Sequence, residues 1–128
     1  MYRPNGEALP KPSSRDPRGN EQEGIRQGLA SLVGAALSVA PRAICGPGRG
    51  TAEISHARQL ALYLAHTTLG LSFTEAGRLF GRDRTTAAHA CRRIEDRRDE
   101  ARVDQLVACL ERAARDAVKP SVRSRSVS

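Results

Sequence analysis

The sequence contains no tryptophan, and aromatic residues make up only 3% of its 128 residues. The apolar positions are therefore filled mainly by Ala, Leu, Val and Ile, which suit thin, closely packed helices. A chain of this length has room for one small domain but not for a second sizeable core. We expect a compact all-α helical bundle.

Cysteine and long apolar runs are scarce as well. The three cysteines lie at positions 45, 91 and 109, and none forms a C-x-x-C pair, which argues against a disulfide framework and a zinc site. The longest weakly polar stretch, residues 29–40, is shorter than the roughly 20 residues of a membrane span, and the start of the chain is unlike a signal peptide. These absences predict a soluble cytoplasmic protein without a metal, a cofactor or a membrane partner.

The sequence shows neither an ATP-binding motif nor a catalytic group of side chains. No G-x-x-x-x-G-K-[ST] phosphate loop occurs, and the glycine-rich residues 46–50 contain no lysine and follow no expected strand. His56, His66 and His89 fall on predicted helices without a paired carboxylate and thiol. We therefore expect a protein that is not an enzyme.

What the chain has in excess is positive charge. Lys and Arg number 21 against 14 acidic residues, which gives a net charge of +7, and 19 of the 21 cations are arginine. Such a balance favours polyanionic partners, and arginine suits bidentate contacts with phosphate or guanine. A GC-rich genome would also enrich arginine codons, so composition alone does not separate DNA contact from codon usage.

The chain divides into a central domain and two polar ends. Residues 1–20 are rich in Pro, Gly and Ser, and residues 119–128 alternate Ser with Arg, so we expect both segments to be disordered tails. The domain between them is expected over residues 21–118. Its apolar residues recur at helical spacing from the start, which predicts a first helix over residues 21–38 that is closed by Pro41.

The next segments alternate loop and helix. Residues 42–50, rich in Gly and Pro, predict a loop. A second helix is expected over residues 51–69, with Gly70 as its C-cap.

Two short helical segments follow. Ser72 and Glu75 have the S-x-x-E form of a capping box, which predicts a helix of about two turns that stops at Gly81. Asp83 is placed to cap a longer helix from Arg84 into residues 97–100, and a last helix should pack back with an apolar face over residues 103–117. A short helix, a tight turn and a longer helix form a helix-turn-helix.

The longer helix has two distinct faces. Helical periodicity places Ala87, Ala90, Cys91 and Ile94 inward, and it places Arg84, Thr85, Ala88, His89 and Arg92 outward. Residues 78–98 hold seven arginines against three acids. This local excess suits a phosphate backbone, to which the helix N-terminus adds N–H groups and partial positive charge.

Two segments carry a family resemblance: residues 57–65, ARQLALYLA, and residues 71–95, LSFTEAGRLFGRDRTTAAHACRRIE. They resemble the C-terminal DNA-binding domain of the bacterial replication initiator DnaA, a Trp-repressor-like helix-turn-helix. The likeness extends over about residues 25–100. Its most specific part is the string R-D-x-T-T-x-x-H-A at residues 82–90.

The resemblance and the outward helix face together give the candidate DNA-binding residues. They are Arg82, Asp83, Arg84, Thr85, Thr86, His89, Arg92, Arg93 and Arg49. Chemically, Asp83 can accept from a cytosine amino group, Thr85 can touch a thymine methyl, and Arg82 and Arg93 can bind phosphates. In the purely structural alternatives, Asp83 is only an N-cap, Thr86 packs inward and His89 is a solvated histidine.

Three features depart from the family pattern. Arg84 stands where the family usually has histidine, and Gly81 is the only glycine where the family has two, so we expect a different turn geometry and base preference. The family also has a basic cluster before its second helix, from which an arginine enters the minor groove, whereas here only Arg49 remains in that segment.

These observations favour a standalone double-stranded DNA-binding protein, associated with the nucleoid, that regulates replication initiation or transcription without the initiator's ATPase. One alternative is a protein-interaction module that binds the replication initiator, a protease or another replication protein; another is a repressor in a phage or toxin–antitoxin setting. The apolar stripes at residues 25–37 and 103–110 would serve a dimer or merely close the core, and we favour the second interpretation and a monomer.

Overall fold

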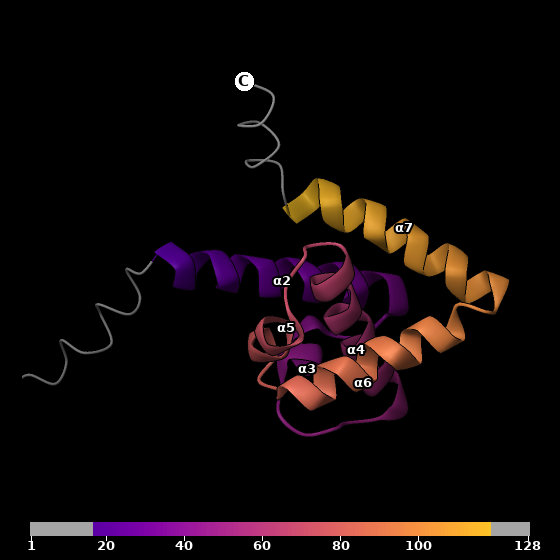
Figure 1. Cartoon of the computed structure of the whole chain (residues 1–128), viewed down its shortest axis with the longest axis horizontal. Coiled ribbons are helices and arrows are strands. Elements are labelled where there is room, and N and C mark those ends of the chain that lie inside the picture. The colour runs from indigo at the N-terminus through magenta and orange to yellow at the C-terminus, as the bar shows by residue number, and fades with distance from the viewer. Residues whose placement is uncertain (1–16, 119–128) are drawn as a thin grey trace, which may run out of the picture.

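The computed structural model of the chain describes residues 17–118, and the tails expected at residues 1–20 and 119–128 lie outside that range except for residues 17–20. Within it the chain is all-α, as predicted, with no strand (Figure 1). The helices are α2 (Pro17–Leu37), α3 (Pro41–Cys45), α4 (Ala52–Thr67), α5 (Phe73–Leu79), α6 (Arg84–Arg97) and α7 (Ala101–Val118). No helix in this part of the chain combines the length and hydropathy needed to cross a membrane.

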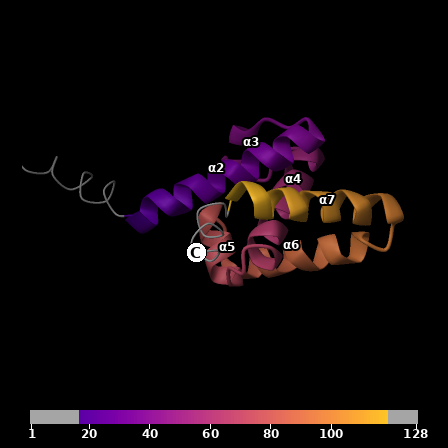
Figure 2. The same cartoon turned by 90° about the horizontal axis from the view of Figure 1, so that it is seen from above.

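Helix α4 is the centre of the bundle and contacts each of the other five helices. An almost continuous set of its residues is buried: Ala57, Arg58, Leu60, Ala61, Leu62, Tyr63, Leu64 and Ala65. Helical periodicity alone would turn only one face of such a helix inward. Burial on nearly every side follows from the position of α4 between α2 and α7 on one side and α5 and α6 on the other (Figure 2).

Helices α2 and α7 lie side by side and close the core (Figures 1 and 2). Leu29 and Val33 of α2 belong to the same buried cluster as Val107 and Leu110 of α7. The two apolar stripes thus face each other within one chain, which is the interpretation we favoured over a dimer contact. Within the apolar faces expected over residues 25–37 and 103–117, Ala36 and Ala117 are exposed and do not belong to the core.

The segment expected to be a loop, residues 42–50, was predicted wrongly in its first part. Pro41 does not merely close α2 but stands in the first turn of the short helix α3, where its missing N–H costs no hydrogen bond. Ile44 is fully buried and anchors this turn to the core. The irregular segment that remains is residues 46–51, which we call the 46–51 loop.

The helix ends largely follow local chemistry. Helix α2 begins at Pro17, before the expected start, and Thr51 caps α4 by accepting the N–H of Ile54 at 3.2 Å. The expected C-cap Gly70 is instead two residues beyond the actual cap, Thr68, and turns the chain with a φ of +76°.

Candidate nucleic-acid interface

The turn between α5 and α6 depends on a close backbone approach. The capping box at the start of α5 is present: Ser72 accepts the N–H of Glu75 at 3.0 Å, and Glu75 accepts that of Ser72 at 2.9 Å. At the other end, a Cβ on Gly77 would stand 2.6 Å from the carbonyl oxygen of Arg82. Gly81 then reverses the chain with a φ of +69°. These glycines allow α6 to start directly beside α5.

Asp83 caps α6, as the sequence predicts. Its carboxylate accepts the N–H of Thr86 at 2.8 Å, and this bond lowers the pKa of Asp83 below its usual value of 3.8. The N–H groups of Arg84 and Thr85, in the first turn, have no acceptor within the helix by geometry. The start of α6 therefore offers hydrogen-bond donors and the positive end of the helix dipole.

The two predicted faces of α6 are confirmed. Its inward residues Ala87, Ala90, Cys91 and Ile94 are buried. On the outward face the polar side chains, Arg84, Thr85, His89 and Arg92, are exposed, and Ala88 is half-buried. Thr86 and Arg93 are exposed too, so the alternative that Thr86 packs inward is wrong.

An open groove runs between the outward face of α6, the first turns of α4 and the 46–51 loop. Its volume is about 640 Å³, and its walls are formed by Gly48, Arg49, Ser55, Arg58, Gln59, Leu62, Arg82, Thr85, Thr86, His89, Ala90 and Arg93. Six of the nine candidate residues are among them. The other three, Asp83, Arg84 and Arg92, lie exposed on or beside α6, outside the groove walls. The walls carry four arginines and no carboxylate, so the groove is a concentrated site of positive charge.

Arg58 forms the base of the groove and was not predicted as a site residue. The residue is only 6% exposed, and its guanidinium donates to five backbone carbonyl groups of the preceding segment. Nε donates to Ile44 at 2.8 Å, Nη1 to Gly48 and Arg49 at 2.9 and 3.2 Å, and Nη2 to Ala43 and Gly46 at 2.9 and 3.3 Å. Burial, and then the nearby Arg82, lowers the pKa of Arg58.

Arg82 is bound to the same loop from the other side. Its Nη1 donates to the carbonyl of Phe80 at 2.8 Å, and its Nη2 donates to those of Gly46 and Gly48 at 3.0 and 2.8 Å. The sequence suggested a phosphate ligand at this position. In the structure its guanidinium is half-buried and holds backbone carbonyl groups instead.

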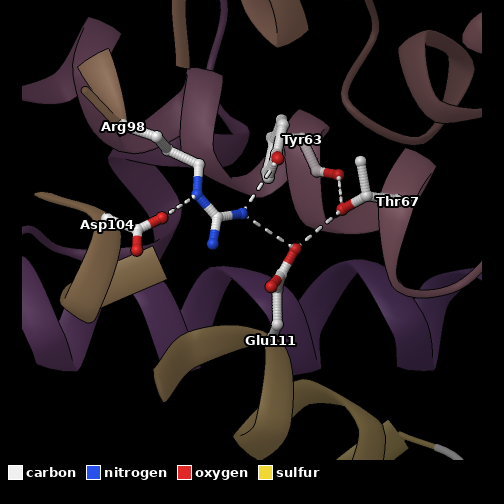
Figure 3. A network of polar contacts seen from close by, with 5 residues as sticks. All are labelled: Tyr63, Thr67, Arg98, Asp104 and Glu111. Carbon is white, nitrogen blue, oxygen red and sulfur yellow. Dashed lines mark hydrogen bonds and ion pairs between the residues drawn. The ribbon is translucent and has the colours of Figure 1, made fainter. Parts of the chain in front are cut away.

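The far end of α6 is held by a polar network around Arg98 (Figure 3). Arg98 Nε donates to Asp104 of α7 at 2.6 Å, and Nη1 donates to the Tyr63 hydroxyl at 3.0 Å and to Glu111 at 3.4 Å. The Thr67 hydroxyl, on α4, donates to the Tyr63 carbonyl and to Glu111. Arg98 was counted among the cations suited to a phosphate backbone, but the network occupies it with carboxylates and thereby fixes α6 against α4 and α7.

His56 lies where α4 packs against α6. Its Nδ1 is buried and finds no hydrogen-bond partner among residues 17–118. Burial lowers the pKa of His56 below its usual 6.5, and the nearby Arg97 and Arg93 lower it further. The neutral imidazole is therefore favoured in the folded chain.

Comparisons with known proteins agree with this geometry. A family profile described as bacterial dnaA protein helix-turn-helix matches residues 28–94. The chain is 37% identical over 114 residues to the chromosomal replication initiator protein DnaA of Thermomicrobium roseum, an alignment that covers 77% of this chain and 24% of that protein. It is 43% identical over 58 residues to DnaA of Bifidobacterium animalis subsp. lactis, covering 44% of this chain and 10% of that protein.

Two solved structures share the fold. A crystal structure of a DNA replication initiation factor superposes with a TM-score of 0.69 at 26% identity, covering 88% of this chain and 33% of that one. The replication initiator DnaA bound to AMPPCP and single-stranded DNA superposes with a TM-score of 0.67 at 27% identity, covering 88% and 32%. The chain thus spans a quarter or less of these curated relatives and about a third of the two solved chains.

Proposed function

The chain belongs to the bacterial DnaA helix-turn-helix family, and from this premise we propose that it binds double-stranded DNA with α6 in the major groove. The observation that carries the proposal is the groove beside α6, whose walls contain four arginines and no carboxylate. A surface of this charge attracts the phosphate backbone and releases its counterions on binding.

Every candidate residue except Arg82 has a direct role in this arrangement. Thr85 and Arg84, exposed in the first turn of α6, face base edges, where arginine pairs with guanine and the threonine methyl meets a thymine methyl. Asp83 either accepts from a cytosine or remains only the helix cap. The side chains further along or around α6 contact phosphates: Thr86, His89, Arg92 and Arg93. Arg49 lies on the opposite wall of the groove.

The biological role we propose is regulatory. The 128 residues carry the initiator family's reading helix, but they contain no G-x-x-x-x-G-K-[ST] phosphate loop. A domain of this kind would occupy initiator sites without driving ATP-dependent origin opening, and would thereby restrain replication initiation or repress nearby transcription. We propose that it does so in association with the nucleoid and as a monomer.

The test is binding of the purified chain to two duplexes, one carrying the initiator's recognition box and one scrambled, measured across a salt series. Arg93→Gln should weaken binding to both duplexes and reduce the slope of log K against log salt by about 0.9, the value for one lost phosphate contact. Thr85→Ala should instead reduce the ratio between the two affinities. Arg112→Gln, on the exposed face of α7, is the matched control and should change neither.

If the chain bound neither duplex, or bound both equally and was indifferent to Thr85→Ala and Arg93→Gln, specific DNA reading would be refuted. The alternative, a module that contacts the initiator or another replication protein, would then be tested by direct binding to the initiator.

A further inference from the structure

Two arginines from distant parts of the chain share the same carbonyl groups of the 46–51 loop. The carbonyl of Gly46 accepts from Nη2 of Arg58 at 3.3 Å and from Nη2 of Arg82 at 3.0 Å. The carbonyl of Gly48 accepts from Nη1 of Arg58 at 2.9 Å and from Nη2 of Arg82 at 2.8 Å. We call these two guanidinium groups and the carbonyls they share the carbonyl clamp.

The clamp joins three parts of the fold. Arg58 comes from α4, Arg82 comes from the turn that leads into α6, and the shared carbonyls belong to the 46–51 loop. Nη1 of Arg82 also donates to the carbonyl of Phe80 at 2.8 Å, which fixes its guanidinium to its own turn. A displacement of the loop away from the turn breaks the bonds to Arg82, and a displacement away from α4 breaks those to Arg58.

The loop needs such restraint because its own backbone supplies little. Arg49 stands between Gly48 and Gly50, which have φ values of +77° and +74°, so the segment combines flexible residues with unusual conformations. Ordering a glycine-rich segment only upon binding costs conformational entropy and weakens affinity. A loop that is held in place beforehand avoids that cost.

Few donors of the Arg82 guanidinium remain available for a phosphate. Three hydrogen bonds direct its Nη groups to backbone carbonyls, and Arg58 uses its own donors in the same way. Arg49 in contrast is exposed and lines the groove opposite Thr85 and Arg93. The direct contact and the support for it thus fall on different residues.

We propose that Arg82 is a positioning residue: with Arg58, it holds the 46–51 loop against the helix-turn-helix so that Arg49 stands at the edge of the groove. This inference rests on the proposed function only for its effect on duplex binding. The clamp itself is a property of the free chain and is tested without DNA.

The first experiment measures trypsin cleavage after Arg49 in the free chain by mass spectrometry. Arg82→Gln should accelerate that cleavage by about tenfold, because loop opening then breaks fewer hydrogen bonds, whereas cleavage elsewhere in residues 17–118 should change little. Arg78→Gln, at an exposed position on α5, is the matched control. An unchanged rate after Arg49, or equal acceleration at every site, would overturn the clamp.

The second experiment separates positioning from phosphate contact with the conservative variant Arg82→Lys. Lysine keeps the charge but lacks the planar fork that reaches the carbonyls of Phe80, Gly46 and Gly48 together. We expect Arg82→Lys to cleave after Arg49 as fast as Arg82→Gln and to bind the duplex as weakly. Recovery of wild-type duplex affinity by lysine would identify a charge contact with phosphate and overturn the proposal.

A double-mutant cycle on duplex binding completes the test. Because Arg82 acts through the loop, Arg82→Gln should weaken binding by less than about twofold once Arg49 is already replaced by glutamine, and the salt slope should not fall a second time. Additive losses, each with its own decrease in slope, would instead make Arg82 a direct phosphate ligand. If the wild-type chain bound no duplex, the proposed function would fail while the trypsin experiment still decided the clamp.

Discussion

Replacing Arg58 by methionine isolates the energetic value of a buried guanidinium that pairs with backbone instead of a carboxylate. Methionine retains much of the apolar stem and removes the five donors. The carbonyls of Gly46 and Gly48 keep Arg82 as a donor, and that of Ala43 keeps the N–H of Gly46 at 3.3 Å. The bond from Nε to the carbonyl of Ile44, at 2.8 Å, is the buried one, and it is lost outright.

The expected loss follows from that carbonyl. An unsatisfied buried acceptor costs roughly 1–3 kcal/mol, and the other bonds are partly open to water, which replaces them at little cost. Removing the charge also removes the unfavourable desolvation that lowers the pKa of Arg58, which offsets part of the loss. We therefore expect Arg58→Met to reduce the free energy of unfolding by about 2 kcal/mol.

Urea denaturation followed by circular dichroism measures this loss as a decrease of the midpoint at unchanged slope. Arg42→Met is the matched control, because Arg42 is an exposed arginine on the neighbouring α3, and it should remain within about 0.5 kcal/mol of the wild type. If Arg58→Met also lost less than about 0.5 kcal/mol, the reasoning would be refuted. The Ile44 carbonyl would then either find another hydrogen-bond donor or lose little stability without one.

Three further changes probe the rest of the domain by the same urea assay. Gly77→Ala should destabilise the chain by roughly 1–3 kcal/mol, because the new Cβ would stand less than 3.0 Å from two backbone carbonyl oxygens. The control Gly24→Ala, in an open part of α2, should stabilise it by about 0.5–1 kcal/mol, and equal effects of the two variants would contradict the close approach at Gly77. Arg98→Met should cost about 1–2 kcal/mol through the lost Figure 3 network, and the exposed Arg102→Met should cost little; similar losses would show that the network adds no stability. Folding lowers the pKa of His56 below 6.5, so the unfolded chain binds more protons at this residue, and the free energy of unfolding should decrease as the pH falls below 6.5. His56→Gln should reduce that decrease, and an unaltered pH profile would exclude His56 as its source.

The parts of the fold that could be predicted from sequence are those decided within a few residues. The capping box of Ser72 and Glu75 and the cap at Asp83 use side chains that reach backbone groups three residues away, so the local sequence contains the whole interaction. The two faces of α6 follow from helical periodicity in the same way. The outward face of α6 and the family resemblance together selected the candidate site residues, and six of them line one groove.

The parts that escaped prediction depend on contacts between distant segments. Helix α3 forms because Ile44 enters the core and Arg58, fourteen residues later, binds the carbonyls at its end, and neither is visible in the glycine and proline content of residues 42–50. A possible signal was an arginine on an otherwise apolar face of α4, without an acidic residue one turn away. Counting charges likewise assigned Arg98 to the DNA surface, because its partners Asp104 and Glu111 lie on the next helix.

The arginines that line the groove also determine which solution conditions can regulate it. A guanidinium keeps its proton throughout the physiological range, so the charges of Arg49, Arg58, Arg82 and Arg93 persist from acidic to alkaline conditions. The groove walls contain no carboxylate that could neutralise them in one pH range and release them in another. Ionic strength screens these permanent charges and is therefore a variable to which this surface responds, so the salt concentration governs how strongly the groove attracts a polyanion.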